Sequence, residues 1–301
     1  MGNTTSQCPG APEFSPVEIS TEYVLGTDMP LLDRDDPSLQ WPYCPSLPAA
    51  ATITACFAAL TIAHLSQALL YRKRFCWVIC MATFWETAGF TMRLLGARDP
   101  RTQAYSIGSN LLVLLSPLWV NAFAYMVVGR MIYYWLPSKS IWRLKARTMT
   151  AWFVWIDVVL FFVQATGGSM LENEDPASAK MGLYIYMAGI GVQQGILLLF
   201  LLIMIKFNIN VHQQGLDRPT SWRRLLYSLY IVLALISIRI TFRLVEFSSG
   251  INGPIPKNEA FFYTLEATPM VLAIGIFAVI HPGRTLTGPE SEFSPLDEAG
   301  S

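Results

Sequence analysis

Three charged side chains stand inside one apolar stretch of the sequence. The stretch Leu225–Phe247 is long enough to cross a bilayer, yet it contains Arg239, Arg243 and Glu246. Such groups offer ion pairing and charge-assisted hydrogen bonds, and charges at membrane depth are costly and usually functional. Positions i, i+4 and i+7 fall on one face of a helix. All three side chains are therefore expected to face the interior of a helix bundle and not lipid.

Polar residues in three other apolar stretches follow comparable spacings. Glu86 and Arg93 lie seven residues apart, as do Asp157 and Gln164, so each pair falls on one helix face, about two turns apart. Glu266 stands in the last apolar stretch. Because an unpaired ion in hydrocarbon is costly, we expect these groups to compensate one another in one polar cluster. The candidate site residues are Glu86, Arg93, Asp157, Gln164, Arg239, Arg243, Glu246 and Glu266.

The charge balance of this cluster predicts one neutral carboxyl group. The acids Glu86, Asp157, Glu246 and Glu266 exceed the arginines by one, and burial disfavours a charged carboxylate. Asp157 and Glu266 are the candidates for the neutral group. The alternative is a static network of ion pairs that only fixes the register of the helices.

The composition indicates which elements position these residues. Hydrophobic residues make up 53% of the 301-residue chain and charged residues 14%, whereas about a quarter of a soluble domain is charged. Apolar stretches of the roughly 20 residues that a membrane helix needs recur seven times, with short connectors: Leu47–Tyr71, Phe75–Gly96, Ala104–Leu136, Met149–Met170, Met181–Phe207, Leu225–Phe247 and Ala260–Ile280. The expected fold is all-α, a polytopic membrane protein with a bundle of seven transmembrane helices.

Basic residues near the ends of these stretches predict the orientation. They concentrate after the first, third and fifth stretches, namely Arg72, Lys73 and Arg74; Lys139, Arg143, Lys145 and Arg147; and Lys206, Arg218, Arg223 and Arg224. By the positive-inside rule, the N-terminus lies outside and the C-terminus in the cytosol. Residues 1–45 are then an extracellular or lumenal tail without a cleavable signal peptide, 46–281 the transmembrane domain and 282–301 a disordered cytosolic tail. The polar cluster falls mainly in the outer half of the membrane.

The outer tail contains two candidate modification sites. Asn3 begins the glycosylation triplet Asn3-Thr4-Thr5, although such triplets often arise by chance. Cys8 and Cys44 fall in the same tail and are able to pair, while Cys56, Cys76 and Cys80 lie in or beside apolar stretches, where a buried small hydrophobe is the default. Glycosylation and pairing both stay open at this point.

Several classes of chemistry are disfavoured. The sequence has no GxxxxGK[ST] phosphate loop and no soluble domain to hydrolyse a nucleotide. Its three histidines, His64, His212 and His281, fall at different depths and suit no zinc site. No enzyme activity, metal or other cofactor is expected, and membrane lipids or lipophilic small molecules, not nucleic acids, are the expected partners. The oligomeric state stays open.

Several motifs in order resemble the fungal RTA-like lipid-translocating exporters. They are Glu86-Thr-Ala-Gly-Phe-Thr-Met-Arg93, Asp157 followed by Gln164-Ala-Thr-Gly-Gly, Arg239-Ile-Thr-Phe-Arg243-Leu-Val-Glu246, Glu259 with Tyr263 and Glu266, and His281-Pro-Gly283. The resemblance runs from Tyr43 to Gly283 and leaves out only the two tails. Phe90 stands where the family usually has Tyr, and Glu266 where it usually has Asp, which keeps the charge but lengthens the side chain.

The resemblance implies a seven-helix protein of the plasma membrane, or of endomembranes, that moves or releases amphiphiles such as sphingoid long-chain bases, phospholipids, toxic sterol analogues or porphyrins. An ammonium group suits Glu246, Glu266 or Asp157, and a phosphate suits Arg93, Arg239 or Arg243. The expected function is ATP-independent export of, or resistance to, such compounds.

A lipid sensor or receptor with the same topology is the alternative function. Against a common receptor type, no acidic residue precedes Arg130 at the end of the third stretch, and the seventh contains no Asn-Pro-x-x-Tyr. The seventh stretch also has no lysine for a retinal Schiff base. By eye, the stretches show no inverted repeat of the kind found in many secondary transporters.

Overall fold

Seven membrane-length helical segments dominate the computed structural model of the chain. It describes residues 7–9, 31–33, 41, 43, 45–171, 173, 175–215, 221–248, 255, 258–286 and 288. Within these ranges, seven helical segments are long and apolar enough to cross a membrane, which confirms the predicted seven-helix fold. They comprise α1 (Leu47–Tyr71), α2 (Trp77–Arg98), α3 (Gln103–Trp135), α4 (Ala146–Leu171), α5 (Pro176–Gln213), α6 (Ser221–Ser248), and a last segment made of α7 (Glu259–Phe261), a π-helix (Phe262–Ala267) and α8 (Thr268–Val279).

The remaining elements are short. Two-stranded antiparallel ribbons form between β1 (Gln7–Pro9) and β2 (Leu31–Asp33), with Cys8 opposite Leu32, and between β3 (Ser140–Ile141) and β4 (Leu144–Lys145). Single 3₁₀ turns cover Arg74–Cys76 and Pro282–Arg284. The glycosylation candidate Asn3 and the pairing of Cys8 with Cys44 lie outside what the structure describes.

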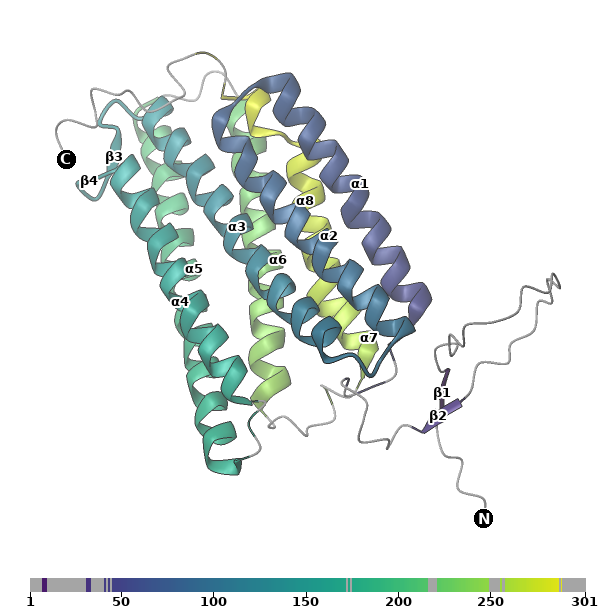
Figure 1. Cartoon of the computed structure of the whole chain (residues 1–301). Coiled ribbons are helices and arrows are strands. Elements are labelled where there is room, and N and C mark those ends of the chain that lie inside the picture. Colours follow the sequence, from purple (N-terminus) through teal and green to yellow (C-terminus); the bar gives the residue numbers. More distant parts are fainter. Residues whose placement is uncertain are drawn as a thin grey trace.

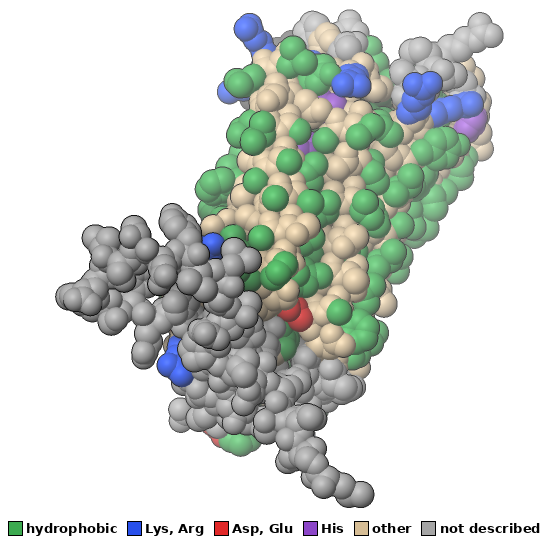
Figure 2. Space-filling view, turned by 90° about the vertical axis from the view of Figure 1, so that its right-hand side faces the viewer, with side chains coloured by type: hydrophobic (Ala, Val, Ile, Leu, Met, Phe, Trp, Pro, Cys, Tyr) green, Lys and Arg blue, Asp and Glu red, His purple; other side chains and the backbone are tan. Residues whose placement is uncertain are grey.

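The long helices lie side by side in one bundle (Figure 1). Each helix packs against the next along the chain, and α8 packs against both α6 and α1. The core lies between them and contains large, fully buried side chains such as Phe57, Phe123, Phe200 and Phe277. The flank of the bundle is largely apolar, and Lys and Arg gather mainly at the end that carries the β3–β4 ribbon (Figure 2). An apolar flank with charged ends is the surface that a bilayer requires.

Helix α5 extends beyond its predicted bounds at both ends. It begins at Pro176, after the N-cap Asp175, and continues to Gln213, whereas the apolar run predicts Met181–Phe207. The extra turns consist of polar and small residues that fit a helix outside the hydrocarbon. Apolar length therefore underestimates a helix that projects from the membrane.

The predicted boundary of the C-terminal tail at residue 282 is too early. The turn Pro282–Arg284 packs on the bundle, where the Arg284 Nε donates to the Tyr71 hydroxyl at 2.7 Å. Leu286 is fully buried. The ordered part of the chain therefore continues at least to Leu286.

The last segment contains a π-helical turn with a local cause. Pro269 has no N–H with which to continue the α-helical ladder. The Thr268 N–H bonds to the carbonyl of Tyr263, five residues back, and its hydroxyl donates to the same carbonyl at 2.8 Å. The wider turn contains Phe262 and Glu266, which are both buried. Turns of this kind occur frequently at functional sites.

Helices α4 and α5 approach each other closely through glycines. A Cβ added to Gly167 would lie 2.6 Å from the Tyr186 nitrogen, and one added to Gly182 would lie 2.8 Å from the Gly167 carbonyl oxygen. At Gly189 an added Cβ would lie 2.9 Å from the Gln164 Cγ. The absence of a side chain at Gly189 thus leaves the space that the Gln164 side chain occupies.

Candidate functional site

Four charged residues from α6 and the π-helix form what we call the ion-pair cluster: Arg239, Arg243, Glu246 and Glu266. Arg243 binds Glu266 through two parallel hydrogen bonds, Nε to Oε2 and Nη2 to Oε1, both 2.9 Å. Its third nitrogen donates to the Glu246 Oε2 at 3.1 Å. Bidentate charge-assisted bonds of this kind are among the strongest in proteins. The prediction that the α6 charges share one inward face is confirmed.

Arg239 ties the ion-pair cluster to α3. It donates to Glu266 and, at 3.2 Å, to the carbonyl of Val113. Glu266 is fully buried and accepts from both arginines. It is therefore the most heavily paired acid among the candidates, which favours Asp157 over Glu266 as the one neutral carboxyl that the charge balance predicts.

Arg93 lies apart from the ion-pair cluster, in a cage of aromatic rings. Its guanidinium carbon lies 3.9 Å from the centroid of Phe262, 4.8 Å from Trp41, and 5.5 Å from both Tyr43 and Tyr263. Arg93 also donates to the Tyr43 hydroxyl and, at 3.2 Å, to that of Tyr263. Desolvated cation–π contacts stabilise such a charge by about 2 kcal/mol or more.

Glu259 closes one end of this cage. Both its oxygens accept from the backbone N–H of Ser46, at 3.0 and 2.8 Å, and one lies 3.9 Å from the Arg93 Nη2. The segment that precedes α1 is thereby held against α2 and α7. Phe262 separates the two arginine groups, since its ring centroid is 6.0 Å from the Arg243 guanidinium carbon.

Asp157 belongs to a third polar group, on α3 and α4. Its Oδ2 accepts from the amide of Asn121 and the hydroxyl of Tyr125, both at 3.0 Å. Its Oδ1 has no hydrogen-bond partner within the described part of the chain. About two turns further along α4, the Gln164 amide donates to the Gln193 Oε1 on α5 at 2.8 Å.

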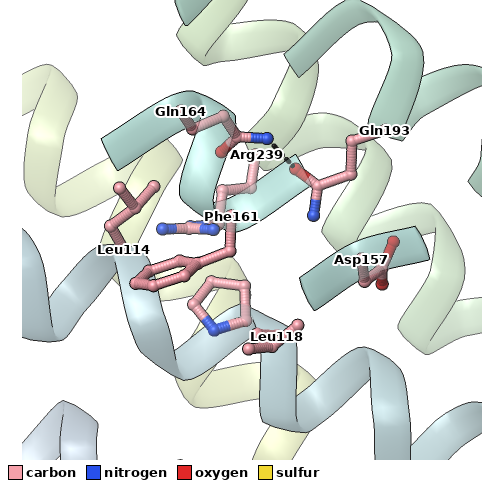
Figure 3. Close-up of a pocket in the computed structure, with 8 residues that line it drawn as sticks. Leu114, Leu118, Asp157, Phe161, Gln164, Gln193 and Arg239 are labelled. Carbon is pink, nitrogen blue, oxygen red and sulfur yellow. Dashed lines mark hydrogen bonds between the residues drawn. The ribbon is translucent and has the colours of Figure 1, made fainter. Parts of the chain in front are cut away.

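A small cavity lies beside Asp157, and we call it the Asp157 pocket (Figure 3). Its volume is about 20 Å³, which admits about one water molecule. The lining residues come from four helices and are Leu114, Pro117, Leu118, Asp157, Phe161, Gln164, Gln193 and Arg239. Arg239 therefore belongs both to the ion-pair cluster and to this pocket, and its Nε has no partner among the residues described.

Glu86 differs from the other candidates. It is buried, with 1% exposure, and neither carboxylate oxygen finds a hydrogen-bond partner in the described ranges. It lies within electrostatic range of Arg239 and Glu266. An unpaired buried carboxylate is costly. Glu86 and Asp157 are therefore the two acids among the candidates that no arginine pairs with directly.

The sequence predicts a single polar cluster, but the structure has three neighbouring groups: the ion-pair cluster, the cage around Arg93 and the polar group at Asp157. The structure brings together Arg239, Arg243, Glu246 and Glu266 by direct contact, and Asp157, Gln164 and Arg239 around one pocket. Arg93 stands behind Phe262, and Glu86 has the Ser116 hydroxyl as its polar neighbour but no bond of good geometry among the described residues. All eight are buried or nearly so.

Several residues of these groups escape prediction. Asn121 and Tyr125 bind Asp157, and Trp41 and Phe262 enclose Arg93. An aromatic residue in an apolar stretch carries no distinctive signal. The four-residue spacing of Asn121 and Tyr125, which places them on one helix face, is the only sequence sign that they act together.

The described residues contain no group of three or more His, Cys, Asp or Glu placed to hold a metal ion. His64, fully buried, bonds through Nε2 with the carbonyl of Ile274 at 3.1 Å. His281 stacks on Tyr71 and accepts from the Gly283 N–H. Both histidines thus have local partners, and these contacts hold the C-terminal halves of α1 and α8 together.

Known proteins provide an independent comparison. The chain is 36% identical over 265 residues to a probable lipid transporter, atnI, of Emericella nidulans. This alignment covers 83% of this chain and 69% of the relative. It is 35% identical to protoporphyrin uptake protein 1 of Saccharomyces cerevisiae over 64% of each chain. It is 22% identical to the sphingoid long-chain base transporter RSB1 of that yeast, over 89% of this chain and 80% of the relative.

No solved structure shows a significant match. The model of the family described as RTA1-like protein matches residues 79–289, which include every candidate site residue. Together with the seven membrane-length helices, this match identifies a multi-pass integral membrane protein. The chain belongs to the RTA1-like family.

Proposed function

We propose that this protein translocates amphiphilic lipids across the membrane without ATP and binds their headgroups at its buried charges. The observation that carries the proposal is the ion-pair cluster, which places two arginines and two glutamates inside an apolar bundle. A bundle of membrane helices needs no such charges for its packing. Relatives named as a lipid transporter and a sphingoid base transporter support the same class of cargo.

The Arg243–Glu246 pair is the accessible edge of the cluster. These side chains keep 16% and 10% exposure, whereas Glu266 is fully buried. A phosphate would bind Arg243 in place of Glu246 and leave that carboxylate without its partner, whereas an ammonium group would bind Glu246 while Arg243 keeps Glu266. The acyl chain would remain in the bilayer.

The assignments of cargo, membrane, orientation and energy source form part of the same proposal. The cargo is a sphingoid long-chain base, a phospholipid or a sterol-like toxic compound, and export confers resistance. The protein resides in the plasma membrane with its N-terminus outside, as the distribution of basic residues predicts. The chain has no phosphate loop, so movement is downhill, linked to protons or driven by a partner, and the protein is not an enzyme.

A lipid sensor is the second candidate, and one observation favours it. Every member of the ion-pair cluster is already paired, and the Asp157 pocket of about 20 Å³ holds no whole headgroup. A sensor would bind lipid and alter the activity of a partner protein without moving the lipid across the membrane.

Release of labelled lipid from cells separates the two functions. Cells that express the protein should release a labelled sphingoid base faster and tolerate more of it. Arg243→Ala should abolish both effects while delivery to the membrane stays normal. Arg224→Ala is the matched control, because Arg224 is an exposed arginine near the start of the same helix. Unchanged release with retained tolerance would refute the transporter and support the sensor.

A further inference from the structure

Glu86 on α2 has an acceptor beside it but, among the described residues, no bonded donor. Its polar neighbour is the hydroxyl of Ser116 on α3, and that hydroxyl donates its one hydrogen to the Ala82 carbonyl at 3.0 Å. The Ser116 oxygen therefore faces Glu86 as an acceptor. A carboxylate only accepts hydrogen bonds, whereas a protonated carboxyl donates one. The surroundings of Glu86 thus suit its neutral, protonated form.

The charge balance also leaves Glu86 without a cation. The two arginines of the ion-pair cluster are balanced by its two glutamates, and Arg93 has Glu259 at 3.9 Å. Glu86 and Asp157 remain, and a buried carboxyl without a cation takes up a proton. The two acids differ in their surroundings, because Asp157 accepts from two donors, whereas Glu86 accepts from none in the described ranges and lies in the field of the ion-pair cluster.

Helix α3 brings Glu86 and the ion-pair cluster to neighbouring levels. Pro117 has no N–H for the carbonyl of Val113, four residues back, and Arg239 donates to this free carbonyl at 3.2 Å. Val113 and Ser116 lie about one helical turn apart. Arg239 and Glu86 therefore meet α3 at adjacent turns, and Arg239 is the opposite charge that acts most strongly on Glu86.

The other charges that act on Glu86 come from the same cluster. They are Glu266 on the π-helix and Arg243 on α6. Helix α1, which also packs against α2, carries the titratable residue His64, whose ring bonds with the carbonyl of Ile274 on α8. The charge on Glu86 is therefore coupled mainly to the ion-pair cluster.

A cationic headgroup would disturb the neutrality of these groups. An ammonium bound to Glu246, while Arg243 keeps Glu266, adds one positive charge, and a buried net charge is costly. Loss of a proton from Glu86 adds one negative charge in the field of Arg239 and restores the balance. We infer that Glu86 is a proton-binding site, and that the protein exchanges the proton of Glu86 for a cationic amphiphile.

The inference rests on the proposed function and specifies its energy coupling and the charge of its cargo. The proton passes from Glu86 to water as the amphiphile binds. A proton returns from water when the amphiphile leaves, so the cycle needs no other reactant.

Proton release on binding tests this exchange. Purified protein in weakly buffered lipid nanodiscs, with a pH-sensitive dye, receives a labelled long-chain trimethylammonium amphiphile, which has no proton of its own to lose; empty nanodiscs give the blank. About one proton should be released per amphiphile bound, and affinity should rise about tenfold per pH unit wherever the free protein keeps the proton, because proton and cation exclude each other.

The outcomes separate the inference from the proposed function. Binding without proton release, at an affinity independent of pH, would overturn the inference and leave the translocator intact. Failure to bind this amphiphile, while a phospholipid binds, would also overturn the inference alone. Failure of both to bind would overturn the proposed function itself.

Two variants assign the proton to Glu86. Glu86→Gln keeps the shape of the neutral carboxyl and a donor for Ser116 but has no proton to release, so release and pH dependence should both be lost at an unchanged melting temperature. Asp99→Asn is the matched control, because Asp99 is the C-cap of the same helix, and it should keep both. Release that persists in Glu86→Gln would place the proton elsewhere and overturn the inference.

Infrared spectra cover the case in which Glu86→Gln fails to fold. In the unmodified protein, the C=O band of one protonated carboxyl should disappear when the amphiphile binds. Ser116→Ala removes the acceptor for this O–H and should shift the same band before binding. A band that neither the amphiphile nor Ser116→Ala changes would overturn the inference.

Discussion

The ion-pair cluster and the Asp157 pocket share Arg239 but differ in how completely their polar atoms are bonded. Every acid and arginine of the ion-pair cluster has a charged partner. In the pocket, Asp157 bonds only neutral donors through one oxygen, and its other oxygen is bare within the described residues. Buried pairs make the fold depend on both members, whereas bare atoms are available to a ligand. Loss of a group should therefore damage stability in the first region and transport in the second.

The largest effect is expected from Glu266→Ala. It leaves Arg239 and Arg243 buried without their common partner, and loss of one member of a buried pair costs about 3–5 kcal/mol. The melting temperature of the purified protein in detergent should fall sharply. Glu246→Ala is the matched control, because Arg243 keeps both bonds to Glu266, and it should cost clearly less than Glu266→Ala. Equal losses of stability in the two variants would contradict the expectation that Glu266 stabilises the fold more than Glu246 does.

A smaller effect is expected from Gly189→Ala on α5. The added methyl would lie 2.9 Å from the Gln164 Cγ, so it should displace Gln164 from Gln193 at a cost of about 1–3 kcal/mol. The melting temperature of the purified protein should fall. Gly191→Ala adds the same methyl to open space on the same helix. If both variants behave like the unmodified protein, the close approach of α4 and α5 does not position Gln164.

Asp157→Asn should separate stability from transport. Asn121 and Tyr125 both donate to one oxygen of Asp157, and an amide oxygen accepts the same two bonds. Stability should change by under about 1 kcal/mol while transport of a labelled lipid slows. A large drop in melting temperature with unchanged transport would show that Asp157 is a structural residue, and the contrast between the two regions would be lost.

The smallest effect concerns Asp175, the N-cap of α5, which lies outside both polar regions. The Ser178 hydroxyl at 2.7 Å, then the N–H groups of Ser178 and Ala177, lower the pKa of Asp175 below its ordinary value of 3.8. A lowered pKa in the folded state means that the cap contributes fully above pH 3.8 and is lost as pH falls further. The protection factor of the Ser178 amide, which is its exchange rate relative to an unprotected amide at the same pH, should fall only below that pH, and in Asp175→Ala it should be low throughout. A fall in protection near pH 6 would contradict the assignment.

The sequence predicts the number of helices well because membrane length and apolar composition nearly determine them. The helix period also predicts that Arg239, Arg243 and Glu246 share one face. The partition of the polar residues into three groups is not predictable this way. It depends on Phe262 lying between Arg93 and Arg243, and on a π-turn that a proline two residues beyond it induces. Partners such as Asn121 become visible only when α3 and α4 are packed together.

The direct test of lipid translocation is the initial rate of transbilayer movement in ATP-free liposomes that contain the purified protein, with labelled lipids of several headgroups. The unmodified protein should move at least one amphiphile faster than protein-free liposomes do, and Arg243→Ala, once it is shown to be folded after reconstitution, should abolish this while Arg224→Ala keeps it. Complete inactivity of the unmodified protein towards every headgroup would contradict autonomous translocation.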